Sequence, residues 1–211
     1  PEFSECWDRF LKEKKETIIL KSAQHAKTML LHGITTARDC GSQSDLSFIL
    51  REMIQKKVIK GPRLIISGNP ITITGGHCHY MGMEADNGEE IVKAIRLLHK
   101  LGVDFVKIMS TGGRLTSRSN PRLAQYTEKE MKSAVQEAHA RNMKIASHAL
   151  GAEGIINSVH AGVDTIAHFA CLGSEEGFAQ CDNIFSEIVE KNIFIEPTLS
   201  ASAQTTQSSI V

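Results

Sequence analysis

The feature that most constrains the fold is a phrase that recurs along the chain. An amphipathic helix is followed by a Gly or Asn and then by a short run of β-forming residues. Gly and Asn tolerate the left-handed backbone that closes a helix, so each marks a helix end before a strand. We therefore expect strands alternating with helices, the pattern of parallel βαβ units. The phrase occurs six times, beginning at His32, Lys60, Leu101, Arg141, Ala161 and Lys191.

Two helix starts support this alternation. Thr127 and Glu130 have the spacing of a capping box, and apolar residues follow at helical spacing. Asn87 and Glu90 repeat that arrangement earlier in the chain. Both pairs come just ahead of a helix of the recurring phrase, as the alternation requires.

The choice of architecture lies between an open doubly wound sheet and a barrel. A dinucleotide-binding sheet is expected to carry GxGxxG and a nucleotide hydrolase GxxxxGK[ST], and neither motif is present. Polar residues gather instead at the ends of successive strands, where (β/α)8 barrels build their active sites. The predicted fold class is therefore α/β, a (β/α)8 TIM-like barrel represented by about six βα units, with two strands missing.

Length and composition narrow the function classes. The 211 residues fit one partial barrel domain over 1–211, with a lead-in at 1–16 and a loop or frayed tail at 200–211. Lys plus Arg and Asp plus Glu each number 24, which argues against nucleic-acid binding, and no apolar run approaches a membrane span. Five cysteines without a CxxC spacing suit a reducing compartment, so we expect a cytoplasmic protein. Because the chain begins at Pro1 without a Met, we expect an excerpt, and the absence of a signal peptide carries little weight.

Three residues on predicted strands could carry chemistry. Lys107 lies mid-strand among apolar neighbours, and His148 and His168 each close a strand. Strand alternation allows all three side chains to point into the barrel, and two converging imidazoles suit a transition metal. The alternative for each histidine is a satisfied core or strand-end side chain.

A second group is His77-Cys78-His79, in the loop after the third strand of the barrel. A structural zinc site usually has a second matched pair of ligands, and metal ligands of barrels sit on rigid strand ends rather than in a Gly-rich loop. We therefore favour contact with substrate or stabilisation of an oxyanion by His77 over direct metal ligation, and a structural role stays open.

A third group is the long, polar, Gly-rich segment 110–121, which resembles an active-site loop. It leads to Tyr126, directly before the Thr127 cap. Tyr126 is predicted either to pack or to donate a hydrogen bond to substrate.

Taken together, the chain resembles the amidohydrolase superfamily, and within it the imidazolonepropionase-like and Xaa-Pro dipeptidase-like branch. The resemblance runs from about Thr28 to Leu199. It is carried by Gly33-Ile34-Thr35-Thr36-Ala37-Arg38-Asp39, Thr74-Gly75-Gly76-His77, Val106-Lys107-Ile108-Met109, Gly112-Gly113, Gln125-Tyr126-Thr127, Glu137-Ala138-His139, Ser147-His148-Ala149, Gly151-Ala152-Glu153, Ala161-Gly162-Val163-Asp164 with Ile166 and His168, and Pro197-Thr198-Leu199.

The resemblance implies a distorted (β/α)8 barrel of which this chain carries strands two to seven. It also implies two divalent metal ions, commonly zinc. By position Lys107 matches a carboxylated lysine that bridges the metals, and His148 and His168 match the ligands on the fifth and sixth strands. The resemblance places His77 near a developing oxyanion or a substrate carboxylate, with Tyr126 assisting. The first-strand His-x-His and the eighth-strand Asp have no counterpart here, and Leu150 replaces a histidine of many relatives.

The expected activity is metal-dependent hydrolysis of an amide (C–N) bond in a small molecule or dipeptide. A lactonase or phosphotriester hydrolase on the same site is the first alternative. A truncated, inactive segment with at most a binding role is the second, because three of six metal-binding groups are absent. An arc of six strands also leaves two unpaired edges, which predicts a homo-oligomer or other self-association, or completion of the barrel by further chain.

Overall fold

A computed structural model of the chain describes residues 13–173, 177, 179 and 181–199; the predicted tail at 200–211 and most of the predicted lead-in at 1–16 lie outside them. The described helices are α2 (Lys15–Leu31), α3 (Leu46–Gln55), α4 (Gly88–Leu101), α5 (Glu128–His139), α6 (Ala152–Ala161) and α7 (Phe185–Glu190), with a 3-10 turn η1 (Asp182–Ile184) before α7. The strands are β1 (Thr36–Asp39), β2 (Arg63–Ile66), β3 (Ile71–Thr72), β4 (Met83–Glu84), β5 (Phe105–Met109), β6 (Lys144–Gly151), β7 (Thr165–Leu172) and β8 (Phe194–Glu196). None of the described helices is long and apolar enough to cross a membrane.

All six strands expected from the recurring phrase are present, as β1, β2, β5, β6, β7 and β8. Their pairings are parallel, as alternation with helices requires. The sequence does not predict the short strands β3 and β4, because two residues are too few to show a period.

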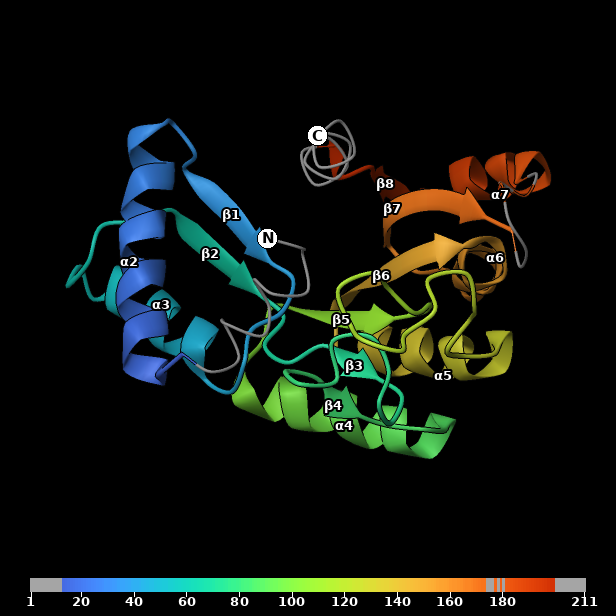
Figure 1. Ribbon diagram of the computed structural model, residues 1–211, viewed down its shortest axis with the longest axis horizontal. Coiled ribbons are helices and arrows are strands. Elements are labelled where there is room, and N and C mark those ends of the chain that lie inside the picture. Colours follow the sequence, from blue (N-terminus) through green and yellow to red (C-terminus); the bar gives the residue numbers. More distant parts are fainter. Residues whose placement is uncertain (1–12, 174–176, 178, 180, 200–211) are drawn as a thin grey trace.

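The strands form an open arc in two parts (Figure 1). One sheet has the order β1-β2, and the other has the order β4-β3-β5-β6-β7-β8. Asp104 joins the two parts: its backbone N–H donates to Ile66 O at 2.8 Å, and its carboxylate accepts from the Ile66 N–H at 2.8 Å. The chain thus forms part of a barrel, with β1 and β8 at the two ends of the arc.

Helices cover the outside of the arc, with α2 and α3 beside β1–β2 and α4 to α7 beside the larger sheet (Figure 1). The apolar faces of α4 to α7 meet the outward side chains of the larger sheet in one core, which includes Ile95, Leu98, Met131, Ile145 and Ile166. This packing leaves the other side of the strands for the polar residues of the candidate site.

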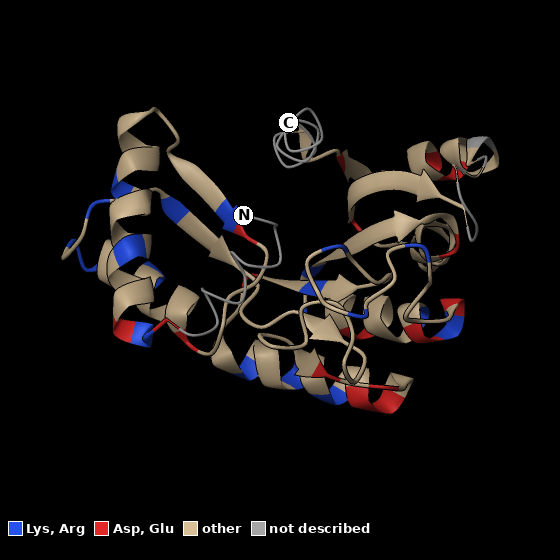
Figure 2. Ribbon diagram, viewed as in Figure 1, with Lys and Arg blue, Asp and Glu red and all other residues tan. Residues whose placement is uncertain are grey.

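The ends of the helices follow the chemistry expected from the sequence. Thr127 and Glu130 form the predicted capping box, and the Asn87 side chain accepts from the Glu89 and Glu90 N–H groups. Gly102 closes α4 with a φ of 81°, in the left-handed region that favours glycine. Acidic residues gather at the start of α4, where they complement the helix dipole (Figure 2).

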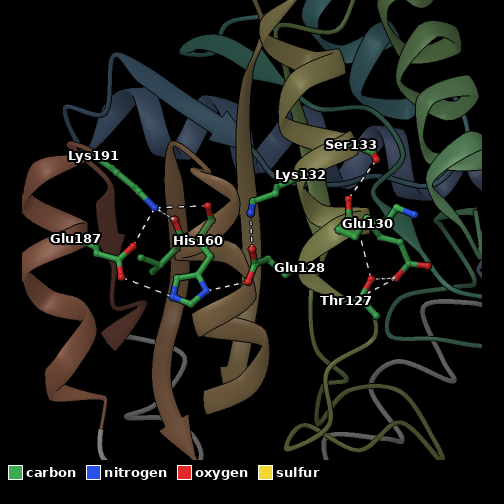
Figure 3. Close-up of polar contacts among 10 residues, drawn as sticks. Thr127, Glu128, Glu130, Lys132, Ser133, His160, Glu187 and Lys191 are labelled. Carbon is green, nitrogen blue, oxygen red and sulfur yellow. Dashed lines mark hydrogen bonds and ion pairs between the residues drawn. The ribbon is translucent and has the colours of Figure 1, made fainter.

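A polar network ties three outer helices together (Figure 3). Lys191 Nζ, just after α7, donates to Val159 O at 3.0 Å at the end of α6 and to Glu187 Oε2 at 3.0 Å. His160 on α6 contacts Glu128 of α5 at 2.9 Å. These contacts link α5 to α6 and α6 to the end of α7 on the outer face of the sheet.

Candidate functional site

Lys107 occupies the middle of β5, on the inner side of the arc. Only 4% of the residue is exposed, and this burial lowers the pKa of its amine. No described residue forms an ion pair or a hydrogen bond with its Nζ. Burial is costly for an ammonium ion and is the largest influence on this pKa, so it shifts Lys107 toward the neutral amine.

His148 lies three residues before the end of β6 rather than at the strand end that the sequence predicts. It is 5% exposed, and burial holds the pKa of its imidazole well below the usual value. Its Nε2 donates to Gly112 O at 3.0 Å. The ring is therefore neutral with its proton on Nε2, which leaves the Nδ1 lone pair free of described partners.

His168 reaches the same side of the sheet for a reason that strand alternation does not supply. Partner residues of parallel strands share a face, and His148 pairs with Ala167 rather than with His168. His168 has a φ of 75° and Phe169 a φ of 53°, both in the left-handed region. This break in β7 turns the imidazole toward the site. Strain of this kind is concentrated at functional sites.

The His168 ring is held through one nitrogen. Its Nδ1 lies 2.6 Å from Thr198 Oγ1, whereas Nε2 has no partner among the described residues. Burial, followed by the charge of Lys107, lowers the pKa of His168 to about 4. Each strand histidine thus has one nitrogen held in place and one nitrogen available for a ligand.

His77 joins these residues from the loop after β3. Its ring centroid lies 4.4 Å from that of His148, which in turn lies 4.6 Å from that of His168. His77 is 4% exposed, and burial, followed by the charge of Lys107, lowers its pKa to about 4. The structure therefore brings four predicted site residues together, although they are far apart in sequence.

The other members of the His77 loop behave differently. His79 is exposed, and its ring contacts Tyr80 rather than His77. Cys78 is buried, with Sγ 3.4 Å from His77 Nε2. The two histidines of this motif therefore do not converge, and the role of His77 stays a prediction.

Tyr126 does not join the group. It is 2% exposed within the hydrophobic core, and its hydroxyl donates to Ala85 O at 2.8 Å. The packing alternative accounts for this placement, because the hydroxyl hydrogen is directed at Ala85 O. The hydrogen bond from Tyr126 to substrate stays a prediction.

The profile of the amidohydrolase family matches residues 4–210. The chain belongs to the amidohydrolase family. Among curated proteins, ochratoxinase from Aspergillus niger is 26% identical over 171 residues, covering 69% of this chain and 35% of that protein.

Solved structures agree with this amidohydrolase fold. A Xaa-Pro dipeptidase with methionine bound in its active site superposes with a TM-score of 0.84 at 28% identity, over 95% of this chain and 51% of that one. The A. niger ochratoxinase structure has a TM-score of 0.83 at 23% identity, over 94% and 49%, and shows the fold alone. The amidohydrolase chain thus spans about half the length of these structures and about a third of the curated relative.

The imidazole nitrogens of His148 and His168 are suitable donors for a divalent metal ion, but these two donors are too few to form a complete metal site. Neutral imidazoles with one nitrogen held by a carbonyl or hydroxyl are the usual form of histidine ligands. Among the described residues, however, no three or more His, Cys, Asp or Glu side chains are arranged to hold a metal ion.

Several residues of the site went unnoticed in the sequence. Thr198 and Gly112 hold the two strand histidines, and Thr116 contacts His77. Arg38 of β1 forms an ion pair with Glu196 of β8 across the inner side of the arc. The motifs of the resemblance contain Arg38, Gly112 and Thr198 but neither Thr116 nor Glu196, and the sequence alone does not tell which partner each residue contacts.

Proposed function

We propose that the protein containing this chain is a metal-dependent hydrolase that cleaves an amide (C–N) bond of a small molecule or dipeptide. The observation that supports it most is the state of the two strand histidines. Each is neutral, held through one nitrogen, and has its other nitrogen free of described partners beside the buried Lys107. Ligand histidines of metal enzymes have this arrangement.

Under this proposal two divalent metal ions, commonly zinc in such sites, are held in part by this chain. His148 would bind through Nδ1 and His168 through Nε2, because their other nitrogens are occupied. Lys107, once carboxylated, would offer two oxygens as a bridge, and burial favours the neutral amine that this modification needs. The metals would supply activation of a water molecule and polarisation of the scissile carbonyl.

The remaining role belongs to His77. A neutral imidazole carries one N–H donor, and the ring lies beside His148 at the edge of the metal ligands. We assign His77 to stabilising the developing oxyanion or binding a substrate carboxylate.

The choice of an amide bond rests on the relatives. One is a Xaa-Pro dipeptidase, and another solved structure is a prolidase bound to N-methylphosphonate-L-proline, 25% identical over 90% of this chain. Both support a small acylated amino acid or dipeptide as the substrate class.

A substrate panel tests the proposal. Full-length protein is incubated with dipeptides, N-acyl amino acids, lactones and phosphotriesters, and we expect turnover of the first two classes.

Lys107→Ala is expected to lower kcat/KM by about a thousandfold or more, because several kcal/mol of charge stabilisation come from the metals. Lys93→Ala, at an exposed position of α4, is the matched control and is expected to leave turnover unchanged. Unchanged turnover in Lys107→Ala would show the proposal to be wrong, and turnover of lactones or phosphotriesters alone would show that the amide assignment is wrong.

A further inference from the structure

The loop that follows β5 holds His77 at two separate points. Gln125 Oε1 accepts from the His77 backbone N–H at 2.7 Å, and Gln125 Nε2 donates to Met109 O at 2.8 Å, which fixes the His77 backbone to the end of β5. Thr116 Oγ1 lies 3.0 Å from His77 Nδ1 and contacts the ring itself. The Gln125 contacts fix the position of the His77 backbone, whereas the Thr116 contact restrains the orientation of the His77 imidazole.

The Thr116 hydroxyl is itself held in place. Thr116 is 6% exposed, and its Oγ1 accepts from the Cys78 backbone N–H at 2.9 Å. It also forms a hydrogen bond with the Tyr80 hydroxyl. A hydroxyl has one hydrogen and two lone pairs, so these contacts restrict how it can face the His77 ring.

Close packing on both faces of the His77 ring restricts rotation of the ring plane. A Cβ built on Gly113 would lie 2.4 Å from His77 Cε1 and from Nε2, so the loop backbone passes directly over the imidazole. The His148 ring lies on His77 with 4.4 Å between centroids. Between these two surfaces the ring plane is fixed, and what remains to be set is which nitrogen carries the proton.

We propose that Thr116 is a positioning residue that sets the ring orientation and the tautomer of His77. The inference rests on the proposed function for the role of His77, and it adds the residue that prepares His77 for that role. A residue that holds a catalytic imidazole through its second nitrogen determines which nitrogen faces the substrate. The segment 110–121, which resembles an active-site loop in its sequence, thus contacts His77 through Thr116.

The test compares three substitutions in the full-length protein. Thr116→Val keeps the shape of the side chain and removes the hydroxyl, Thr116→Ser keeps the hydroxyl, and Ser117→Ala removes an exposed hydroxyl of the same loop as the control. With the best substrate of the panel, we expect Thr116→Val to lower kcat/KM about 10–100-fold and Thr116→Ser to recover to within about threefold. Ser117→Ala is expected to match the unsubstituted protein.

Two further measurements distinguish an effect on the position of His77 from a general disruption of the fold. In a His77→Ala background, Thr116→Val is expected to cause no additional loss, because its effect passes through the missing imidazole. Nitrogen NMR of histidine-labelled protein is expected to show a changed His77 tautomer in Thr116→Val that returns in Thr116→Ser. Should Thr116→Val not fold, Thr116→Ala replaces it in each comparison.

The outcomes distinguish this inference from the function on which it rests. An unchanged His77 NMR signature in Thr116→Val, or additive losses in the double variant, would overturn the role of Thr116. If the unsubstituted protein hydrolyses nothing in the panel, the proposed function is wrong, and the NMR comparison still decides whether Thr116 sets the His77 tautomer.

Discussion

At the scale of single residues, His168 shows why a sequence pattern can place a side chain correctly for the wrong reason. Strand alternation from its pairing partner would turn His168 away from His148, yet the two rings lie 4.6 Å apart. The positive φ of His168 makes the difference, and no sequence period reports a backbone angle of that kind. Lys107 and His148, in regular strands, follow the alternation from which they were predicted.

Gly113 is the residue whose substitution tests the packing of the site. In Gly113→Ala the new Cβ would meet the His77 ring at 2.4 Å, so ring or loop must move. We expect a loss of about 1–3 kcal/mol in the free energy of unfolding, typical of overpacking, and lower kcat. Gly88→Ala at the start of α4, whose Cβ would lie 3.1 Å from the rotatable Ser133 hydroxyl of α5, is the control and is expected to be neutral. Equal stability of both variants in urea unfolding would contradict the contact.

At the scale of elements, the six regular strands were predictable because each follows a helix stop in the same phrase. The Thr127 capping box was predictable for the same reason, since its chemistry is local. Contacts between residues far apart in sequence were not predictable. Tyr126 donates a hydrogen bond to Ala85, 41 residues away, and Thr116 contacts His77, 39 residues away. Only the tertiary fold brings such pairs together, so an ambiguous Tyr126 could not be resolved from the sequence.

Asp164 joins three elements and gives a pH-dependent prediction. Its carboxylate accepts from Lys144 Nζ at 2.7 Å, from His139 Nε2 at 2.8 Å and from the Ile145 N–H at 2.9 Å. Burial alone would raise the pKa of Asp164, but these donors together lower it below the usual value. Because the folded-state pKa lies below the unfolded value of about 3.9, the stabilisation is present above that pH and is lost as the pH falls through the folded pKa.

The expected outcome for Asp164→Asn is a loss of about 1–3 kcal/mol at pH 7, since hydrogen bonds to a charged group are removed. The difference from the unsubstituted protein should shrink as the pH is lowered below about 4. Urea unfolding across this pH range measures it, with Glu190→Gln at an exposed position as control. A loss that stays constant down to low pH would contradict the ionised state of Asp164.

At the scale of the whole molecule, the chain is an arc whose two ends approach through side chains rather than strand pairing. Arg38 of β1 forms an ion pair with Glu196 of β8, and its guanidinium lies 5.3 Å from the Phe105 ring centroid. Beyond this contact β8 and the segment that follows it present apolar side chains, with Phe194 of β8 73% exposed and Leu199, three residues after the strand, 72% exposed. We propose that a further segment or a second copy covers this surface, as the unpaired edges predict.

Self-association of the 211-residue chain follows from that surface. We expect it to sediment as a dimer or larger species without hydrolase activity, because the resemblance implies a first-strand His-x-His and an eighth-strand Asp among the metal ligands, and neither has a counterpart in these residues. Phe194→Lys is expected to shift the distribution toward monomer, whereas Leu20→Lys, at a residue 71% exposed on α2, is expected to have no effect. A monodisperse monomer with turnover would contradict the proposed surface.

The most direct test of the central claim is the location of metal in the full-length protein. Anomalous diffraction at the zinc absorption edge measures this without any assumption about substrate. We expect two peaks beside Lys107, one of them about 2.0–2.1 Å from His148 Nδ1 and His168 Nε2, with continuous density for a carboxylated lysine. Peaks at His77 or His79 instead, or no peak in protein prepared with zinc, would contradict the assignment of the site.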